Sequence, residues 1–294
     1  MTRYAVFDNS SPHNLLAALQ WYLDHGVDDV LDHYPVDRTK PAAALMPVPS
    51  QLPSSAPVAS SPVFTPSPAQ IAPGQGQQVA ETLSTAQAII EAQRCVQKAE
   101  TLVQLHQAIK DFDGLSVKNT ARNMVFADGH PEADIMVIGE APGRDEDLQG
   151  KPFVGVSGQL LDKIFAAIGL SRGAEDAAQA LYISNILNWR PPGNRTPTPA
   201  EIDIARPFIE KHIDLVRPKI LVLCGAVAAR GLLGQTQSIA KMRKIFHDYQ
   251  TPDGHQAAAM VTYHPAYLLR TPSQKRAVWQ DMLMLQRQLR TPVT

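Results

Sequence analysis

The chain has 294 residues, of which 44% are hydrophobic and 19% are charged, so it can bury one ordinary globular core and a small accessory unit. Its formal net charge of −1 excludes a protein that binds nucleic acid through a strongly basic overall balance, so any such binding needs a local basic surface. The two cysteines, Cys95 and Cys224, are too few for a four-cysteine metal site, and the nine histidines show no metal-binding spacing, so we expect no metal or other cofactor and a reduced, cytoplasmic protein.

The first 78 residues are predicted to lie outside the main domain. They begin with MTRYAVFDNS, which has neither the basic leader nor the long apolar stretch of a signal peptide or a membrane span. Residues 1–40 are expected to form a small helical segment that packs on the main domain or binds a protein partner, because apolar residues recur there with helical spacing up to Gly26. Residues 41–78 contain nine of the 24 prolines and no Asp, Glu, Lys or Arg, a composition typical of a disordered linker.

The rest of the chain is predicted to be a helical lead-in over residues 79–110 followed by one domain over residues 111–294. In that domain, helical stretches alternate with short apolar runs suited to buried strands, which cover residues 133–140, 181–187, 219–225 and 257–263. This alternation predicts an α/β fold, a three-layer α/β/α sandwich with a mainly parallel central sheet.

Two helices of this domain carry start signals. Ser157 is expected to cap a helix over residues 157–170. Thr198 and Glu201 are expected to form a capping box, with a proline at the first helical position, for a helix that stops before Pro218.

Polar residues follow the predicted strands at the edge where a ligand is expected. In an open parallel sheet the ligand site lies beyond the carboxyl ends of the strands, and Gly139 with Glu140, Asn185 and His264 stand at three such ends. The turn over residues 139–155 is rich in Gly and Pro, so its backbone can approach a ligand closely, and Phe153 in it can present a ring to a flat base.

The second segment, residues 184–201, offers two amides, Asn185 and Asn194, and an amide presents a donor and an acceptor side by side, which suits the edge of a nucleobase. In the third segment, residues 262–276, His264 can donate a hydrogen bond to a departing anion. An apolar wedge and cations for DNA phosphates follow it, namely Leu268, Leu269, Arg270, Lys275 and Arg276. Taken singly, each segment is more typical of a structural role, namely a core aromatic, a turn-forming Asn or a His at a strand end.

Taken together, GEAPG with an acidic run and KPFVG, then SNILNWRPPGNRTPTPAE, then HPAYLLR closely resemble the three signatures of the family 4 uracil-DNA glycosylases. The resemblance runs from about Leu115 to the C-terminus. It implies a monofunctional DNA repair enzyme that hydrolyses the N-glycosidic bond of uracil in single- or double-stranded DNA and leaves an abasic site.

The resemblance also implies roles for individual residues. Phe153 stacks on the uracil, Asn185 reads it, and His264 donates to the leaving group, while Gly139 and Glu140 belong to the motif at the base pocket. Glu146 and Asn194 match family positions near the sugar and the attacking water. The general glycosylase motif has a water-positioning Asp where this sequence has Ala141, so Glu140, Glu146 and Asn194 all stay open as the group that positions the water.

The sequence departs from that family at the iron–sulfur cluster. The positions that match its four cysteine ligands hold Lys110, Asp113, Trp189 and Ala205, so we expect no cluster. Burial of Trp189 and its neighbours can take over the structural role that the resemblance gives the cluster.

Two alternatives from other functional classes stay open. One is a damage-binding protein on the same fold, either catalytically weak or trapping uracil sites covalently, as one related subgroup does with a basic, histidine-containing insert after the second signature. Residues 189–201 run through here without such an insert. The other is an interaction module that acts through the N-terminal helix.

Overall fold

The computed structural model describes residues 84–235 and 237–290, so the helical segment expected within residues 1–40 and the linker expected over residues 41–78 lie outside it. The described chain opens with two helices, α2 (Thr85–Gln97) and α3 (Leu102–Asp111), which confirm helical structure in the described part of residues 79–110. Both have N-caps that satisfy free backbone N–H groups: Ser84 accepts from the Gln87 N–H, and Thr101 begins a capping box.

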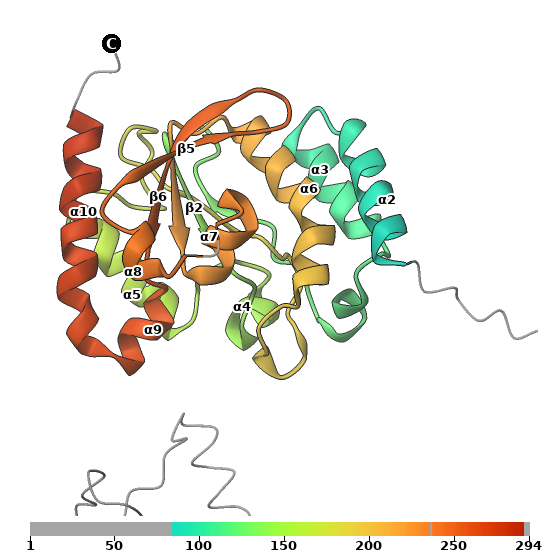
Figure 1. The fold of residues 1–294 in the computed structure, drawn as a ribbon, viewed down its shortest axis with the longest axis horizontal. Helices are drawn as coiled ribbons and strands as arrows, with labels where there is room; N and C mark the ends of the chain where they lie inside the picture. Colours follow the sequence, from blue (N-terminus) through green and yellow to red (C-terminus); the bar gives the residue numbers. More distant parts are fainter. Residues whose placement is uncertain (1–83, 236, 291–294) are drawn as a thin grey trace, which may run out of the picture. The chain divides into compact units, whose positions relative to one another are not determined.

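A six-stranded sheet with the order β1-β3-β2-β4-β6-β5 forms the centre of the fold (Figure 1). Its four inner strands are mutually parallel and coincide with the four apolar runs, which confirms the predicted α/β class: β3 (Tyr182–Asn185), β2 (Ile135–Gly139), β4 (Ile220–Cys224) and β6 (Gln256–Thr262). The two edge strands, β1 (Asp128–Gly129) and β5 (Phe246–Gln250), pair antiparallel and were not predicted.

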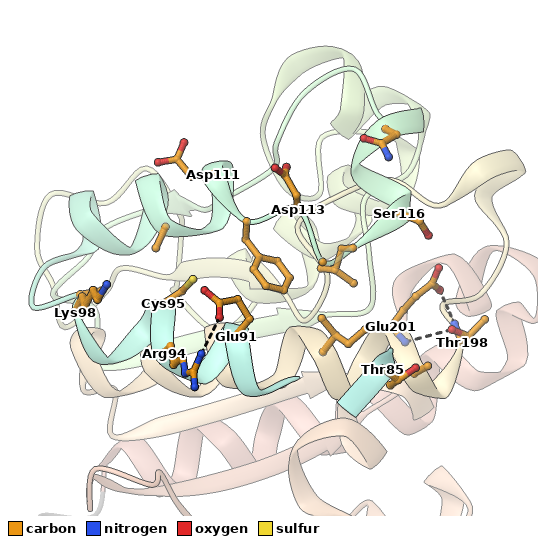
Figure 2. Close-up of a pocket in the computed structure, with 18 of the residues that line it drawn as sticks. Thr85, Glu91, Arg94, Cys95, Lys98, Asp111, Asp113, Ser116, Thr198 and Glu201 are labelled. Atoms are coloured by element: carbon orange, nitrogen blue, oxygen red, sulfur yellow. Dashed lines mark hydrogen bonds and ion pairs between the residues drawn. The ribbon is translucent and has the colours of Figure 1, made fainter. Parts of the chain in front are cut away.

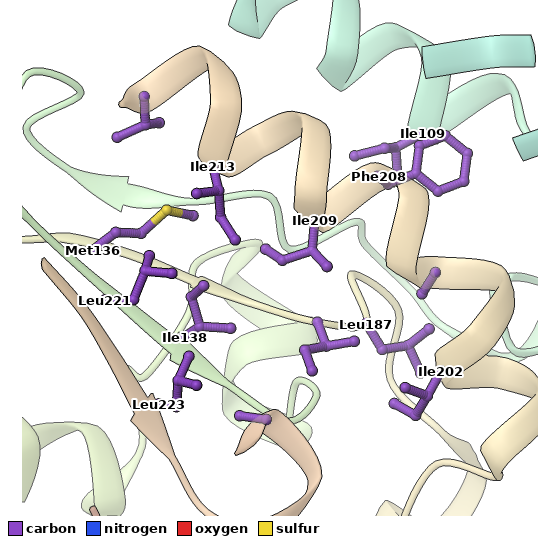
Figure 3. Close-up of a cluster of buried hydrophobic side chains, with 14 of the residues drawn as sticks. Ile109, Met136, Ile138, Leu187, Ile202, Phe208, Ile209, Ile213, Leu221 and Leu223 are labelled. Carbon is purple, nitrogen blue, oxygen red and sulfur yellow. The ribbon is translucent and has the colours of Figure 1, made fainter. Parts of the chain in front are cut away.

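Helices cover both faces of the sheet, as expected for three layers. One face is covered by α6 (Pro199–Val216) and α7 (Ala226–Leu233), with α2 and α3 packed against α6, and the other is covered by α5 (Val156–Ala166), α9 (Pro265–Arg270) and α10 (Lys275–Arg290). Because side chains alternate along a strand, Met136 and Ile138 of β2 enter the first layer, whereas Ile135 and Val137 enter the second. Figure 3 shows α6 laid across the first layer of strand side chains.

The helix starts agree with the sequence at one site and differ at the other. Thr198 and Glu201 form the predicted capping box of α6, which ends at Val216, two residues before Pro218. Ser157, however, is not a cap: α5 begins one residue earlier, at Val156, and its N-cap is Gly155. The short elements are η1 (Ser116–Thr120), α4 (Arg144–Gln149), η2 (Pro192–Asn194), α8 (Ile239–Met242) and η3 (Pro272–Gln274). Among the described helices, none combines the length and the apolar character that crossing a membrane requires.

Candidate active site

A cavity of about 450 Å³ opens at the carboxyl ends of β2, β3 and β6. The three segments singled out in the sequence meet there, and the side chains that line it include Glu140, Glu146, Phe153, Asn185, Asn194 and His264. A larger cavity of about 1050 Å³ lies between α2, the segment after α3 and the start of α6 (Figure 2). None of its lining residues follows a strand of the parallel sheet, so we place the candidate site in the smaller cavity.

Asn185 is held at the floor of the site by the sheet itself. It is the last residue of β3, stands in register with Gly139 of β2, and its side chain is only 2% exposed. A Cβ atom at Gly139 would lie 2.3 Å from Asn185 Oδ1 and 2.6 Å from the Phe153 ring, so only glycine leaves both side chains in place. The Asn185 amide makes no hydrogen bond to any other residue that the structure describes, and is therefore available to a ligand.

Glu146 organises the loop that carries Phe153. Its Oε1 accepts from the backbone N–H groups of Val154 and Gly155, both at 2.9 Å, and its Oε2 accepts from the Gly143 N–H at 3.1 Å. Because both carboxylate oxygens are engaged with the backbone, this side chain ties the two ends of the loop together. It lines the cavity but is 91% buried, at 9% exposure.

Phe153 and His264 lie against one another, with ring centroids 5.4 Å apart and planes inclined by 27°. His264 is the N-cap of α9, and its Nδ1 accepts from the Ala266 N–H at 3.2 Å. An accepting Nδ1 carries no proton, so the neutral ring presents Nε2–H as its donor. Burial lowers the pKa of His264 to about 4, with Arg270 lowering it further and Glu146 opposing both, so the ring is neutral at pH 7.

Glu140 and Asn194 differ in whether their side chains are already hydrogen-bonded within the protein. The Glu140 carboxylate forms no hydrogen bond or ion pair with another described residue, and partial burial raises its pKa. Asn194 is exposed, and its backbone lies in the left-handed region with φ at 56°. Its Oδ1 accepts a hydrogen bond from Arg190 Nε at 2.7 Å. The amide N–H groups of Asn194 have no partner among the described residues, whereas Oδ1 already accepts one hydrogen bond.

The third segment divides into core and surface. Leu268 is fully buried beneath the sheet, so the expectation that it could act as a wedge is wrong. Leu269, next along α9, is 43% exposed and remains available for that role. Arg270, Lys275 and Arg276 are all exposed, and Arg270 also lines the cavity.

The structure adds residues that the sequence interpretation missed. Arg195 lines the cavity and forms a two-point ion pair with Glu201, with N to O distances of 2.6 and 2.8 Å. Gly225, with φ at 98°, lies against His264, where a Cβ atom would be 3.2 Å from the histidine Cβ. Arg190 and Arg195 lie within the second segment, so the sequence could have indicated them as candidate site residues. Gly225 follows a strand with no polar residue after it that pointed to the site, so the sequence did not indicate it.

The positions that match the cluster cysteines do not fit an iron–sulfur cluster. Trp189 and Ala205 are buried in one hydrophobic cluster, and Lys118 lies 5.9 Å over the Trp189 ring while its Nζ binds Asp113 at 2.6 Å. None of these side chains is a thiolate, and the described residues contain no group of three or more His, Cys, Asp or Glu that could hold a metal.

Comparisons with known proteins bear on the part of the chain that holds this cavity. The family model of the uracil DNA glycosylase superfamily matches residues 126–283, which include every residue that lines the cavity. The type-4 uracil-DNA glycosylase of Pyrobaculum aerophilum is 30% identical over 187 residues, covering 62% of this chain and 92% of that protein. Those of Saccharolobus solfataricus and Thermotoga maritima are 36% identical over 179 residues and 37% identical over 163, covering 59% and 54% of this chain and 80% of each relative. The resemblance drawn from the three sequence segments is thus confirmed, and the chain belongs to the uracil DNA glycosylase superfamily.

Proposed function

We propose that the protein is a DNA repair glycosylase that hydrolyses the N-glycosidic bond of uracil in DNA, releasing free uracil and leaving an abasic site. The observation that carries the proposal is the meeting of Phe153, Asn185 and His264 around one cavity at the strand ends. These side chains supply a ring, an amide and a neutral donor within residues 126–283, the range that matches the uracil DNA glycosylase superfamily, and relatives at 30% and 36% identity are named as uracil-DNA glycosylases. The reaction adds water across the bond between C1′ and N1 and needs no redox partner.

Base selection rests on the Asn185 amide. Uracil has a donor at N3–H and an acceptor at O4, so Oδ1 accepts from N3 while Nδ2 donates to O4. Cytosine shows the opposite pattern at these atoms and leaves two buried polar groups mismatched. Because Asn185 is 2% exposed and unpartnered among described residues, water cannot easily compensate for a mismatch.

Departure of the base rests on His264. As the glycosidic bond breaks, negative charge develops on the uracil ring and collects at O2 and N1. A neutral imidazole with Nε2–H directed at O2 stabilises that charge without first having to lose a proton, and burial makes the hydrogen bond stronger than it would be in water.

We assign the positioning of the attacking water to Glu140. Glu146 uses both oxygens on backbone N–H groups, and Asn194 uses its only side-chain acceptor on Arg190. Glu140 is the remaining candidate, and its carboxylate is free of partners among the described residues. Its raised pKa also makes it a better proton acceptor for a water that attacks C1′. The free N–H groups of Asn194 suit an acceptor such as a sugar or phosphate oxygen.

DNA is held by a local basic surface, since the whole chain is close to neutral. Arg270, Lys275 and Arg276 bind phosphates beside the cavity, and Leu269 fills the gap in the base stack when the nucleotide is flipped out. We propose activity on both single- and double-stranded DNA and a cytoplasmic location. For residues 1–40 we propose a role in binding a partner protein, so deletion of residues 1–78 should leave excision from short oligonucleotides nearly unchanged.

The test is excision from an end-labelled oligonucleotide with a single uracil, heated in alkali to break the strand at abasic sites. A matched oligonucleotide with thymine at the same position is the control. The wild-type protein should release uracil with turnover, so that alkali breaks the uracil strand and leaves the thymine strand whole. Binding without strand cleavage, or a covalent adduct that resists denaturation, would instead identify a damage-binding protein on the same fold.

A further inference from the structure

The backbone of Phe153 adopts a conformation that it would not hold unaided. Its φ is 53°, in the left-handed region, where a bulky residue with a Cβ atom clashes with the neighbouring carbonyl at a cost of about 1–2 kcal/mol. The ring nevertheless sits in the site with only 5% exposure. Its direction therefore depends on whatever fixes the backbone at this one residue.

Arg172 fixes that backbone from one side. Its Nη1 donates to the carbonyl oxygen of Pro152 and its Nη2 to that of Phe153, both at 2.9 Å. The two bonds hold consecutive peptide groups, and so they define the rotation on either side of the Phe153 Cα. A guanidinium can do this because its donors lie in one rigid plane, whereas an ammonium offers a single donor centre.

Arg172 is itself held in place. Its Nε donates to Asp162 Oδ1 at 2.9 Å, from α5, and its Nη1 also contacts Asp128 Oδ2 at 3.2 Å, from β1. The side chain is only 16% exposed, so these contacts are partly shielded from water and fix the guanidinium plane. Two carboxylates from separate elements thus orient one arginine toward one loop.

Gly158 lets the backbone of α5 pack against the same peptide. A Cβ atom at this position of α5 would lie 1.9 Å from the Phe153 oxygen and 2.1 Å from its carbonyl carbon. The helix backbone is therefore in direct contact with the strained peptide, and Arg172 and Gly158 both adjoin the Phe153 carbonyl group. Arg172 lies outside residues 139–155, 184–201 and 262–276, and it does not line the cavity.

We infer that Arg172 is a positioning residue for the stacking ring of Phe153, so that it controls the rate of uracil excision without touching the base. The inference rests on the proposed function. The simpler reading is that Arg172 contributes ion pairs to the stability of the fold. The two interpretations differ in whether loss of the hydrogen bonds from Arg172 to the Pro152 and Phe153 carbonyl oxygens slows excision through the Phe153 ring.

The experiment is a double-mutant cycle of Arg172→Lys and Phe153→Leu, read as single-turnover excision at saturating protein. Arg172→Lys should slow excision about 10- to 100-fold, the range expected for a group displaced by up to about 1 Å, with little change in DNA affinity. If Arg172 acts through the ring, the double variant is no slower than Phe153→Leu alone. Arg206→Lys is the matched control, because Arg206 pairs with Asp203 on α6, does not line the cavity, and its replacement should leave excision unchanged.

A second measurement keeps the inference testable if excision cannot be read. Amide hydrogen exchange of wild-type protein and Arg172→Lys is compared over residues 144–158 and over the inner strands. If Arg172 holds the Phe153 loop in place, amide exchange in Arg172→Lys should be faster in the loop and unchanged in the inner strands. Multiplicative rate losses in the cycle, an unchanged excision rate in Arg172→Lys, or unchanged loop exchange would each overturn the inference. If the wild-type protein releases no uracil, the proposed function fails, and the exchange measurement alone then decides the role of Arg172.

Discussion

Asn185 is the residue whose chemistry we expect excision to depend on most directly. In Asn185→Asp a carboxylate replaces the amide, so the donor toward O4 is lost and a negative charge faces an acceptor. Loss of one well-placed hydrogen bond of this kind costs about 2.7–4 kcal/mol, or about 100- to 1000-fold in rate. Single-turnover excision measures the loss, and Asn119→Asp, the same change at an exposed position away from the cavity, is the control. Full activity in Asn185→Asp would show that the Asn185 amide does not recognise the uracil base.

Single residues could be placed from the sequence where the fold dictates their position. Gly139, Asn185 and His264 stand next to buried strands, and the carboxyl ends of parallel strands necessarily meet at one edge. Which polar side-chain atoms are already hydrogen-bonded within the protein could not be predicted, because this depends on contacts between residues far apart in the sequence. That the Glu146 carboxylate is used up by loop N–H groups, while that of Glu140 is not, follows only from the three-dimensional structure.

At the scale of elements, α9 offers a contrast between two adjacent leucines. Leu268 is fully buried and Leu269 is 43% exposed. Leu268→Ala should lower the free energy of unfolding by about 2–5 kcal/mol, because it opens a cavity in the core. Leu269→Ala should leave stability nearly unchanged and reduce excision more from paired than from single-stranded DNA, since only a duplex has a stack to fill. Urea denaturation and excision assays on both substrates measure these effects. An equal loss on the two substrates would argue against a wedge.

The start of α10 carries the cations that we expect to contact DNA. In Lys275→Ala/Arg276→Ala, affinity should fall similarly for all sequences, and the slope of log affinity against log salt should become shallower by up to about two units. Fluorescence anisotropy with labelled DNA over a salt series measures the slope. Lys211→Ala/Lys219→Ala removes two lysines that pair with Asp253 and Asp134 and serves as the control. A wild-type slope in the first variant would place the DNA path elsewhere.

Elements were predictable where apolar patterning is strong. The four inner strands of the sheet are buried on both faces and so appear as continuous apolar runs. β1 has two residues and β5 reads FHDYQ, so neither carries that pattern, and both are strands only because an exposed edge of the sheet is there to pair with. Ser157 failed as a cap because α5 begins where the Phe153 loop ends, with Glu146 already holding the Gly155 N–H.

For the molecule as a whole, burial of His212 contributes to the dependence of stability on pH. His212 is 1% exposed, hydrogen-bonds the Tyr182 hydroxyl at 2.9 Å and stacks on Phe126. Burial lowers its pKa from 6.5 to about 3, so the unfolded chain binds a proton that the folded protein excludes. The contribution of neutral His212 to the free energy of unfolding is therefore fully present above pH 6.5. It is lost progressively as the pH falls from 6.5 toward 3.

The variant His212→Gln tests this response, since glutamine keeps a polar partner for Tyr182 but does not titrate. Each pH unit below the unfolded pKa costs about 1.4 kcal/mol for one such histidine. Between pH 7.5 and pH 5, the decline in the free energy of unfolding should thus be about 2 kcal/mol smaller in His212→Gln than in the wild type. Urea denaturation at both pH values measures it. Equal declines in the two proteins would mean that His212 is protonated in the fold.

The order of the strands has a consequence for how the chain becomes active during synthesis. β2 and β4 pair although Val137 and Val222 lie far apart in the sequence, and β6 must then add beside β4, between it and β5. His264 lies two residues after the end of β6, so a nascent chain can complete β2, β3 and Asn185 while it still lacks the side chain that we propose to stabilise the departing base. Until that last parallel strand docks, the β4 edge also exposes unpaired backbone groups to other chains. The proposed site is therefore completed only after β6 has been synthesised, so we do not expect a chain that still lacks β6 to release uracil.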